Sequence, residues 1–272
     1  GAALGIAGAW TQTSSRNPIA SPDVLGVSGG AAVAVVLGTL VARPAFADDL
    51  PGFWWRCLLA LAGSAVIVAL LFAFGGVGTS RRVILVGVAL SLMCHAAVSY
   101  LMVRADLARA AEAQTWLAGS TGFVRWEAVP PLAAAAAPFV ALGAWGWRDL
   151  PVLAHDDDSA RALGVDVGRV RARLLVASTG LVAVTVSVVG PIAFVALVAP
   201  QLARLASRAP VAPPVASAAA GAALLSGCAV LAGLLPATVP VGLITAIIGG
   251  PALVALVLRA APRVHAQARS SS

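Results

Sequence analysis

The feature that most constrains the fold of this 272-residue chain is its series of long apolar runs, separated by short polar stretches. A bilayer core is about 30 Å thick, and about 20 helical residues are needed to cross it. We expect the runs to be membrane-spanning helices, because a helix satisfies its own backbone groups in lipid. The expected segments are 1–14, 26–42, 53–74, 82–103, 127–147, 170–189, 191–206, 213–235 and 241–259.

Composition favours a membrane protein over a soluble one. Hydrophobic residues make up 60% of the chain and charged residues 11%, against about 45–50% and about 25% in soluble domains. So few charges could not cover so much apolar surface in water. We therefore predict an all-α, polytopic transmembrane helical bundle of about nine helices, forming a single transmembrane domain over residues 1–272.

The basic residues are all arginine, and their distribution indicates an orientation. The net charge is +7, but the arginines are scattered between apolar runs, which argues against a nucleic-acid partner. Most of them fall in one alternate set of loops, including 148–173 and the stretch from 259 onward. The positive-inside rule makes that set cytoplasmic. We expect a cytoplasmic C-terminus, and one further helix before the first run in the complete protein.

A polar turn, RNPIASPD at residues 16–23, separates the first two apolar runs. Pro18 and Pro22 fix their own φ angles and restrict the residues before them, so we expect a stiff turn. The arginine distribution places it on the cytoplasmic side. The residues alone leave two interpretations open: an ordinary surface turn, or an element near a cytosolic partner.

The longest polar cytoplasmic stretch, about 148–170, contains a predicted short helix. Asp156, Asp157 and Asp158 precede SARALGV, and carboxylates are stabilised at a helix N-terminus by the helix dipole. Gly164 suits a C-terminal cap. Three adjacent carboxylates on a loop do not converge on one ion without other ligands, so we expect no metal site. An amphipathic helix along the membrane surface, contacted by a soluble partner, explains the polarity better.

Glycine and proline interrupt the later apolar runs, notably at Gly190-Pro191 and Pro200. A proline inside a helix removes a hydrogen bond and frees a carbonyl that needs another partner. Broken helices of this kind are common around transport pathways. A packing kink without a role in transport explains any single site equally well.

Five motifs, taken in order, resemble the permease subunits of ATP-binding-cassette importers for iron–siderophore complexes, haem and vitamin B12, the FecCD type. They are GAALGIAGAWTQTSSRNPIASPDVLGVSGGAA (1–32), GTSRRVILVGVALS (78–91), DDSARALGVDVGRVR (157–171), VVGPIAFVALVAPQLARL (188–205) and LPATVPVGLITAIIGGPALVALVLR (235–259). Each is weak alone, but together they cover nearly the whole chain. The resemblance implies a ten-helix fold, of which this chain carries helices two to ten, and a translocation path between two identical or related permease subunits.

The resemblance also implies roles for particular residues. The turns that narrow the cytoplasmic end of the path match Asn17, Ile19, Thr79 and Ser80. The coupling helix, which contacts a groove of the ATPase subunit, matches Asp157, Asp158, Ala160, Arg161, Leu163 and Gly164. The helix-break and pathway positions are Gly190, Pro191, Pro200 and Arg204. One departure is Gln201, because the family often has a histidine there.

The implied function is that of a permease subunit that imports an iron(III) siderophore or a related metal chelate across the bacterial inner membrane. The implied partners are a cytosolic ATP-binding-cassette ATPase, a second permease subunit, an extracytoplasmic substrate-binding protein and membrane lipid. The sequence has no G-x-x-x-x-G-K-[ST] phosphate loop, so we expect the partner to hydrolyse ATP. No catalytic residue and no cofactor are expected in this chain.

Two other functions fit the sequence less well. An ion-driven secondary transporter would use acidic residues within its spans, whereas the acids here fall in loops or at span edges. An intramembrane metalloprotease would need histidines and acids at helical spacing, which His95, His155 and His265 do not provide. His95 lies in the middle of a span, either as a pathway residue or as a neutral histidine bonded to a neighbouring helix.

Overall fold

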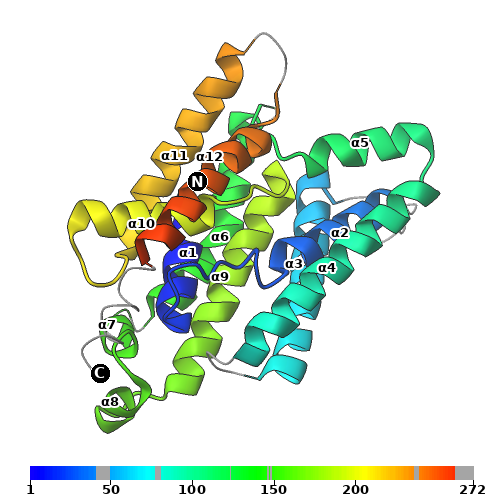
Figure 1. Ribbon diagram of the computed structural model, residues 1–272. Coiled ribbons are helices and arrows are strands. Elements are labelled where there is room, and N and C mark those ends of the chain that lie inside the picture. The colour runs from blue at the N-terminus through cyan, green and yellow to red at the C-terminus, as the bar shows by residue number, and fades with distance from the viewer. Residues whose placement is uncertain are drawn as a thin grey trace.

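The computed structural model describes residues 1–40, 50–76, 81–122, 124–145, 147, 149–235 and 239–260, and these ranges contain helices and no strand. The helices are α1 (Ala2–Ser15), α2 (Val27–Leu40), α3 (Gly52–Gly75), α4 (Arg81–Arg104), α5 (Leu107–Leu117), the 3-10 turn η2 (Trp126–Ala128), α6 (Val129–Ala144), α7 (Asp149–Leu153), α8 (Asp157–Ala162), α9 (Val167–Val189), α10 (Val195–Ser207), α11 (Pro214–Leu234) and α12 (Val241–Ala260) (Figure 1). Every predicted apolar run contains a helix among its described residues. The predicted all-α transmembrane fold class is confirmed.

Five of the described segments are long and apolar enough to cross a membrane. They are Gly52–Gly75, Leu85–Arg104, Trp126–Ala144, Val167–Val189 and Pro214–Leu234. Three further apolar helices are shorter, namely Val27–Leu40, Val195–Ser207 and Val241–Ala255.

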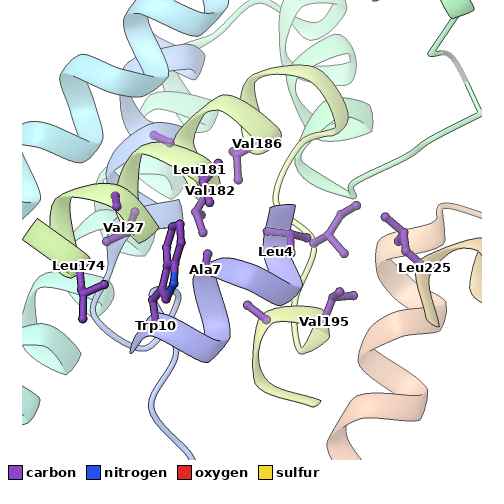
Figure 2. Packing of buried hydrophobic residues seen from close by; sticks show 14 of the residues in the cluster. Leu4, Ala7, Trp10, Val27, Leu174, Leu181, Val182, Val186, Val195 and Leu225 are labelled. Carbon is purple, nitrogen blue, oxygen red and sulfur yellow. The ribbon is translucent and has the colours of Figure 1, made fainter. Parts of the chain in front are cut away.

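Helices α1 and α9 form the centre of the bundle. In α9, 72% of the most apolar 18-residue stretch is buried, against 17% of the corresponding stretch in α4 and 6% in the segment that contains α6. Figure 2 shows Leu4, Ala7 and Trp10 of α1 among side chains of the surrounding helices. Their neighbours in this cluster include Val27, Leu174, Leu181, Val182, Val195 and Leu225. The outer helices α4 and α6 leave most of their apolar surface uncovered.

Glycines in α1 allow its backbone to touch α10 and α11. A Cβ atom at Gly5 would lie 2.0 Å from the Ser217 carbonyl oxygen, and one at Gly8 would lie 1.7 Å from the Ala196 carbonyl oxygen. Small residues permit such close helix contacts in membranes. Pro200 lacks an N–H, so the Ala196 carbonyl has no donor within α10. Gly8 therefore brings α1 against the point where the hydrogen-bond ladder of α10 is interrupted.

The predicted run 191–206 is wrong at its start, because α10 begins at Val195. Gly190 has a φ of 74° and Phe194 a φ of 66°, so the backbone leaves the helical region twice between α9 and α10. α10 then continues through Pro200 without a break. Helix α5 lies outside the apolar runs and sits at the end of the molecule opposite α8 (Figure 1).

Candidate functional site

Helix α8 has the caps that the sequence predicts. The Asp156 carboxylate accepts a hydrogen bond from the Ser159 N–H at 2.7 Å, and this bond lowers the pKa of Asp156. At the other end, the Gly164 N–H donates to the Arg161 carbonyl and the Val165 N–H donates to the Ala160 carbonyl, with Gly164 at a φ of 82°. This pair of bonds is the Schellman motif, in which glycine adopts the left-handed conformation without cost from a Cβ. The helix itself ends at Ala162.

The predicted coupling residues of α8 divide into a buried side and an exposed side. Ala160 is fully buried against the bundle, whereas Leu163 is 71% exposed. The side chains of Asp158 and Arg161 are also exposed and form an ion pair at 3.0 Å. The outward side of α8 therefore presents one large apolar side chain among charged ones.

Asp157 does not belong to that outward side. Arg171 of α9 donates through Nη1 and Nη2 to both oxygens of the Asp157 carboxylate, at 2.9 and 2.8 Å. Arg16, which directly follows α1, donates through Nη2 to Asp157 Oδ1 at 2.7 Å. The hydrogen bonds from Arg171, helped by the positive charges of Arg171, Arg16 and Arg161, lower the pKa of the Asp157 carboxyl. We refer to Arg16, Asp157 and Arg171 as the Asp157 cluster.

The Asp157 cluster is also bonded to the end of α1. The Arg171 Nε–H donates to the Ser14 carbonyl oxygen at 3.0 Å, which satisfies one of the carbonyls that a helix C-terminus leaves free. Arg16 itself has a φ of 48° and ends α1 in the left-handed conformation. That conformation costs a non-glycine residue about 1–2 kcal/mol. An arginine therefore occupies a backbone position that glycine would fill more easily.

The turn after α1 lies on a cavity of about 510 Å³. Asn17 and Ile19, two of the predicted gate residues, are among its lining residues, together with Arg16 and Arg171. Asn17 stabilises the turn, because its side-chain oxygen accepts the Ile19 N–H at 3.1 Å. The other predicted gate residues, Thr79 and Ser80, lie outside the described residues.

A buried amide pair connects the same turn to α10. Gln201 donates through Nε2 to the Gln12 side-chain oxygen and to the Pro18 carbonyl, the latter at 3.1 Å. Gln12 in turn donates to the Leu197 carbonyl of α10 at 2.9 Å. Both glutamines are almost fully buried. Gln201, which departs from the family pattern, is thus bonded to the turn that carries two gate candidates.

The four predicted helix-break and pathway residues do not lie together. Arg204 lines a cavity of about 170 Å³ beside Arg16 and Asn17, near α8, and Pro200 lies within α10. Gly190 and Pro191 lie at the opposite end of α9. A Cβ atom at Gly190 would lie only 2.1 Å from the Trp116 carbonyl oxygen. These residues contribute to two separate regions.

Gly190 belongs to a set of backbone contacts that we call the Gly190 junction, formed by residues 116–120, 189–191 and 242. The Ser120 N–H donates to the Val189 carbonyl at 2.8 Å, and the Gly242 N–H donates to the Gly119 carbonyl at 2.9 Å. The junction joins the ends of α5 and α9 to the start of α12. A cavity of about 850 Å³ lies beside it, with Arg56, Arg125 and Glu127 among its lining residues.

Two further expectations concern metal ligands and His95. In the part of the chain that the structure describes, no three His, Cys, Asp or Glu side chains are grouped as a metal site. His95 Nδ1 lies 2.9 Å from the Ser91 carbonyl oxygen of its own helix, and its side chain is exposed. Of the two interpretations of His95, the hydrogen bond to a neighbouring helix is not found among the described residues.

Sequence reasoning missed the Asp157 cluster and the glutamine pair. Asp157 stands between two other aspartates, and nothing local distinguishes the carboxylate that turns inward. Its partners are 14 and 141 residues away in the chain. A usable signal was the presence of Arg16 immediately after the first apolar run, because an arginine at a membrane boundary needs an anionic or solvent partner.

Comparison with known proteins places the chain in a family. Residues 1–259 match the FecCD transport family. The chain is 35% identical to the hemin transport system permease protein HmuU of Yersinia pestis, over 95% of this chain and 78% of that protein. It is 34% identical to the ferric enterobactin transport system permease protein FepG of Escherichia coli, with the same coverage of both proteins.

A solved structure supports the same relationship. The inward-facing conformation of a metal-chelate type ABC transporter aligns with a TM-score of 0.81 and 27% identity, over 95% of this chain and 82% of the other. Members of the family are the permease subunits of ABC importers, in which a separate ATPase subunit hydrolyses ATP. This chain belongs to the FecCD transport family and is a membrane permease, not an ATP-hydrolysing enzyme.

Proposed function

We propose that this chain forms part of an ATP-driven importer for a ferric siderophore or a related metal chelate, and that α8 docks on the ATPase. The observation that carries the proposal is the form of α8. It is a short capped helix whose Ala160 side chain is buried against the bundle and whose C-terminal end exposes Leu163. A leucine held out of a charged surface suits an apolar pocket on a soluble partner. Family membership supports an ATPase as that partner.

In this proposal the end of the molecule that carries α8 faces the cytoplasm of a bacterium, within the inner membrane. The distribution of arginines supports that orientation, and it places the C-terminus on the same side. Asn17 and Ile19 then lie at the cytoplasmic end of the path, where Ile19 is 42% exposed beside the cavity of the turn. Thr79 and Ser80 complete this gate. A small polar residue and a bulky apolar one narrow a path without placing a fixed charge in it.

A second permease subunit, identical or related, completes the translocation path. Helix α4 supports this, because Leu85, Leu92 and Val103 are exposed by 69%, 66% and 85%. Such a face needs cover from a second subunit or from lipid. Closure of two ATPases against two α8 helices would then move the permease halves as rigid bodies and switch access to the path.

The cargo enters at the opposite end, where an extracytoplasmic binding protein delivers it. Relatives of this chain carry hemin and ferric enterobactin in their names. The large cavity beside the Gly190 junction has two arginines and one glutamate among its lining residues. An excess of positive charge favours the approach of an anionic chelate. We therefore place a ferric siderophore first among the possible cargoes.

The function is tested by reconstituting the chain with its candidate ATPase and binding protein in vesicles, and by measuring uptake of a labelled ferric siderophore. We expect uptake that requires ATP and the ATPase. Hemin and cobalamin in parallel vesicles decide the class of chelate. Uptake driven by an ion gradient without any ATPase would instead support the secondary-transporter alternative and contradict the proposal.

The docking role of α8 is tested by Leu163→Asp. We expect this variant to insert in the membrane normally but to lose most of its ATPase on co-purification, because a carboxylate would have to enter an apolar pocket. Leu107→Asp is the matched control, since Leu107 is 88% exposed at the end opposite α8. Equal retention of the ATPase by both variants would contradict docking at α8.

A further inference from the structure

The Asp157 cluster links α8 to α9 and to the residue that follows α1. Asp157 lies in the first turn of α8, Arg171 lies in α9, and Arg16 lies between α1 and the turn that carries Asn17 and Ile19. Arg16 also donates through Nη1 to the His155 carbonyl, at 3.4 Å. A displacement of α8 therefore acts on the chain directly before the turn through a charged side chain, without passing through the apolar core.

The two arginines bind Asp157 differently. Arg171 makes a bidentate pair with the carboxylate and also donates to the Ser14 carbonyl, and its side chain is only 9% exposed. A planar guanidinium whose three nitrogen atoms each donate a hydrogen bond is held in a fixed orientation. Arg16 contributes a single bond to Asp157, and its side chain is 28% exposed. Arg171 thus holds the carboxylate in place. Arg16 links that carboxylate to the turn, so that the turn follows when the carboxylate moves.

The backbone of Arg16 gives independent support. The Arg16 N–H donates to the Thr13 carbonyl and the Asn17 N–H donates to the Gln12 carbonyl, which is the helix ending that favours glycine in the left-handed position. A residue kept in an unfavourable backbone conformation indicates that its side chain is needed. Here the side chain is the one that reaches α8.

We propose that Arg16 is a positioning residue that, through Asp157, couples movement of α8 to the turn at Asn17 and Ile19. The inference rests on the proposed function, because α8 must be moved by an ATPase for the coupling to operate. In the absence of this link, the ATPase would still bind and hydrolyse ATP, but the turn would no longer follow α8. The alternative is that the cluster only stabilises the fold.

Arg16→Gly separates these two roles. Glycine relieves the left-handed backbone at this position, so the variant should unfold no more easily than the wild type. We expect it to bind the ATPase and to hydrolyse ATP at the wild-type rate. The amount of chelate imported per ATP should fall about fivefold, the factor that corresponds to about 1 kcal/mol for one partly exposed ion pair.

Two companion variants complete the test. Arg16→Lys keeps a positive charge within reach of Asp157 and should restore most of the coupling. Arg169→Gln removes an exposed ion pair with Asp166 at the same end of the molecule and should leave the ratio of import to hydrolysis unchanged. An equal loss in Arg169→Gln would mean that any missing surface charge has this effect, and that result would overturn the inference.

The outcomes separate this inference from the proposed function. If the wild type shows no ATP-driven uptake of any chelate, the proposed function fails and this inference fails with it. If the wild type is active and Arg16→Gly imports as much chelate per ATP, the inference alone is overturned. A loss of uptake in Arg16→Gly that matches a loss of folded protein would also overturn it, because it would assign Arg16 a structural role only.

Discussion

The two ends of this bundle are joined by different kinds of interaction. At the α8 end, helices α1, α8 and α9 meet through charged side chains of the Asp157 cluster. At the opposite end, α5, α9 and α12 meet through backbone hydrogen bonds at the Gly190 junction. Glycines there bring backbone atoms so close that no Cβ would fit.

This difference leads us to expect movement at the α8 end rather than at the Gly190 junction. A backbone hydrogen bond needs a donor–acceptor distance of about 2.7–3.2 Å and weakens steeply when its angle falls below about 120°, so we expect the Gly190 junction to tolerate little displacement. An arginine that is bonded to a carboxylate on another element follows the movement of that element as long as the bond holds. The α8 end is therefore suited to transmit a movement, and the Gly190 junction is suited to remain fixed during it.

The largest effect should come from adding one methyl group at the Gly190 junction. Gly190→Ala strains a left-handed backbone. It also places the new Cβ atom against the Trp116 carbonyl oxygen, at an ideal distance of only 2.1 Å. We expect a loss of about 3 kcal/mol in the free energy of unfolding, the sum of backbone strain and overpacking. Thermal unfolding in detergent, followed by circular dichroism, measures it.

Gly164→Ala is the matched control at the other end. Gly164 has a similar φ of 82°, but nothing lies within 4 Å of an added Cβ. Only the backbone strain remains, so the loss should be about 1 kcal/mol. Equal losses at Gly164 and Gly190 would show that the close contact with Trp116 adds nothing, and that the junction is less tightly packed than its geometry indicates.

A smaller effect is expected from Arg171→Gln at the α8 end. The variant removes the bidentate pair with Asp157 and leaves the Ser14 carbonyl without a donor. We expect a loss of about 2 kcal/mol, because charge-assisted hydrogen bonds at a side chain only 9% exposed are stronger than neutral ones. Arg169→Gln, at an ion pair whose arginine is 90% exposed, should cost under about 0.5 kcal/mol. Chemical denaturation measures both free energies of unfolding. Similar losses in Arg171→Gln and Arg169→Gln would show that burial does not strengthen the bonds of Arg171.

Local rules explain how much of this fold could be predicted from sequence. Apolar runs form membrane helices because lipid offers the backbone no other hydrogen-bond partner. The caps of α8 are predictable because Asp156 and Gly164 lie close together in the sequence and act on the helix between them. The start of α10 was misplaced, because a left-handed Phe194 has no sequence signal comparable to that of glycine.

The candidate site was less predictable, because its contacts are distant in sequence. Gln12 and Gln201 are 189 residues apart, and Arg16 and Asp157 are 141 residues apart. The family resemblance identified α8 and the turn after α1 as separate elements. It assigned Asp157 to the ATPase-facing surface, whereas the structure turns this carboxylate toward Arg16 and Arg171.

The glutamine pair should contribute less than the Asp157 cluster. Gln201→Leu leaves the Gln12 side-chain oxygen and the Pro18 carbonyl without their donor. We expect a loss of about 1 kcal/mol, since hydrogen bonds between membrane helices average about 0.6 kcal/mol and reach about 1.7. Unfolding of Gln12→Leu, Gln201→Leu and the double variant gives the coupling energy. Strict additivity would show that the two amides do not interact.

The smallest effect is a pH dependence that should appear at the α8 end and not at the Gly190 junction, which has no titratable group among its described contacts. The pKa of Asp157 is lowered from its ordinary value of 3.8, first by hydrogen bonds from Arg171. A depressed pKa adds stability above the unfolded-state value of about 3.8, and that stability is lost as the pH falls through the folded-state pKa. Because Asp157 is 24% exposed, we expect a contribution of about 0.5–1 kcal/mol.

The drop in stability between pH 7 and pH 3 should be smaller in Asp157→Asn than in the wild type. Asp156 titrates in both proteins, so its effect cancels in the difference. Identical drops would show that the Asp157 carboxylate gains no stability from its two arginines, and the contrast between the two ends would then rest on geometry alone.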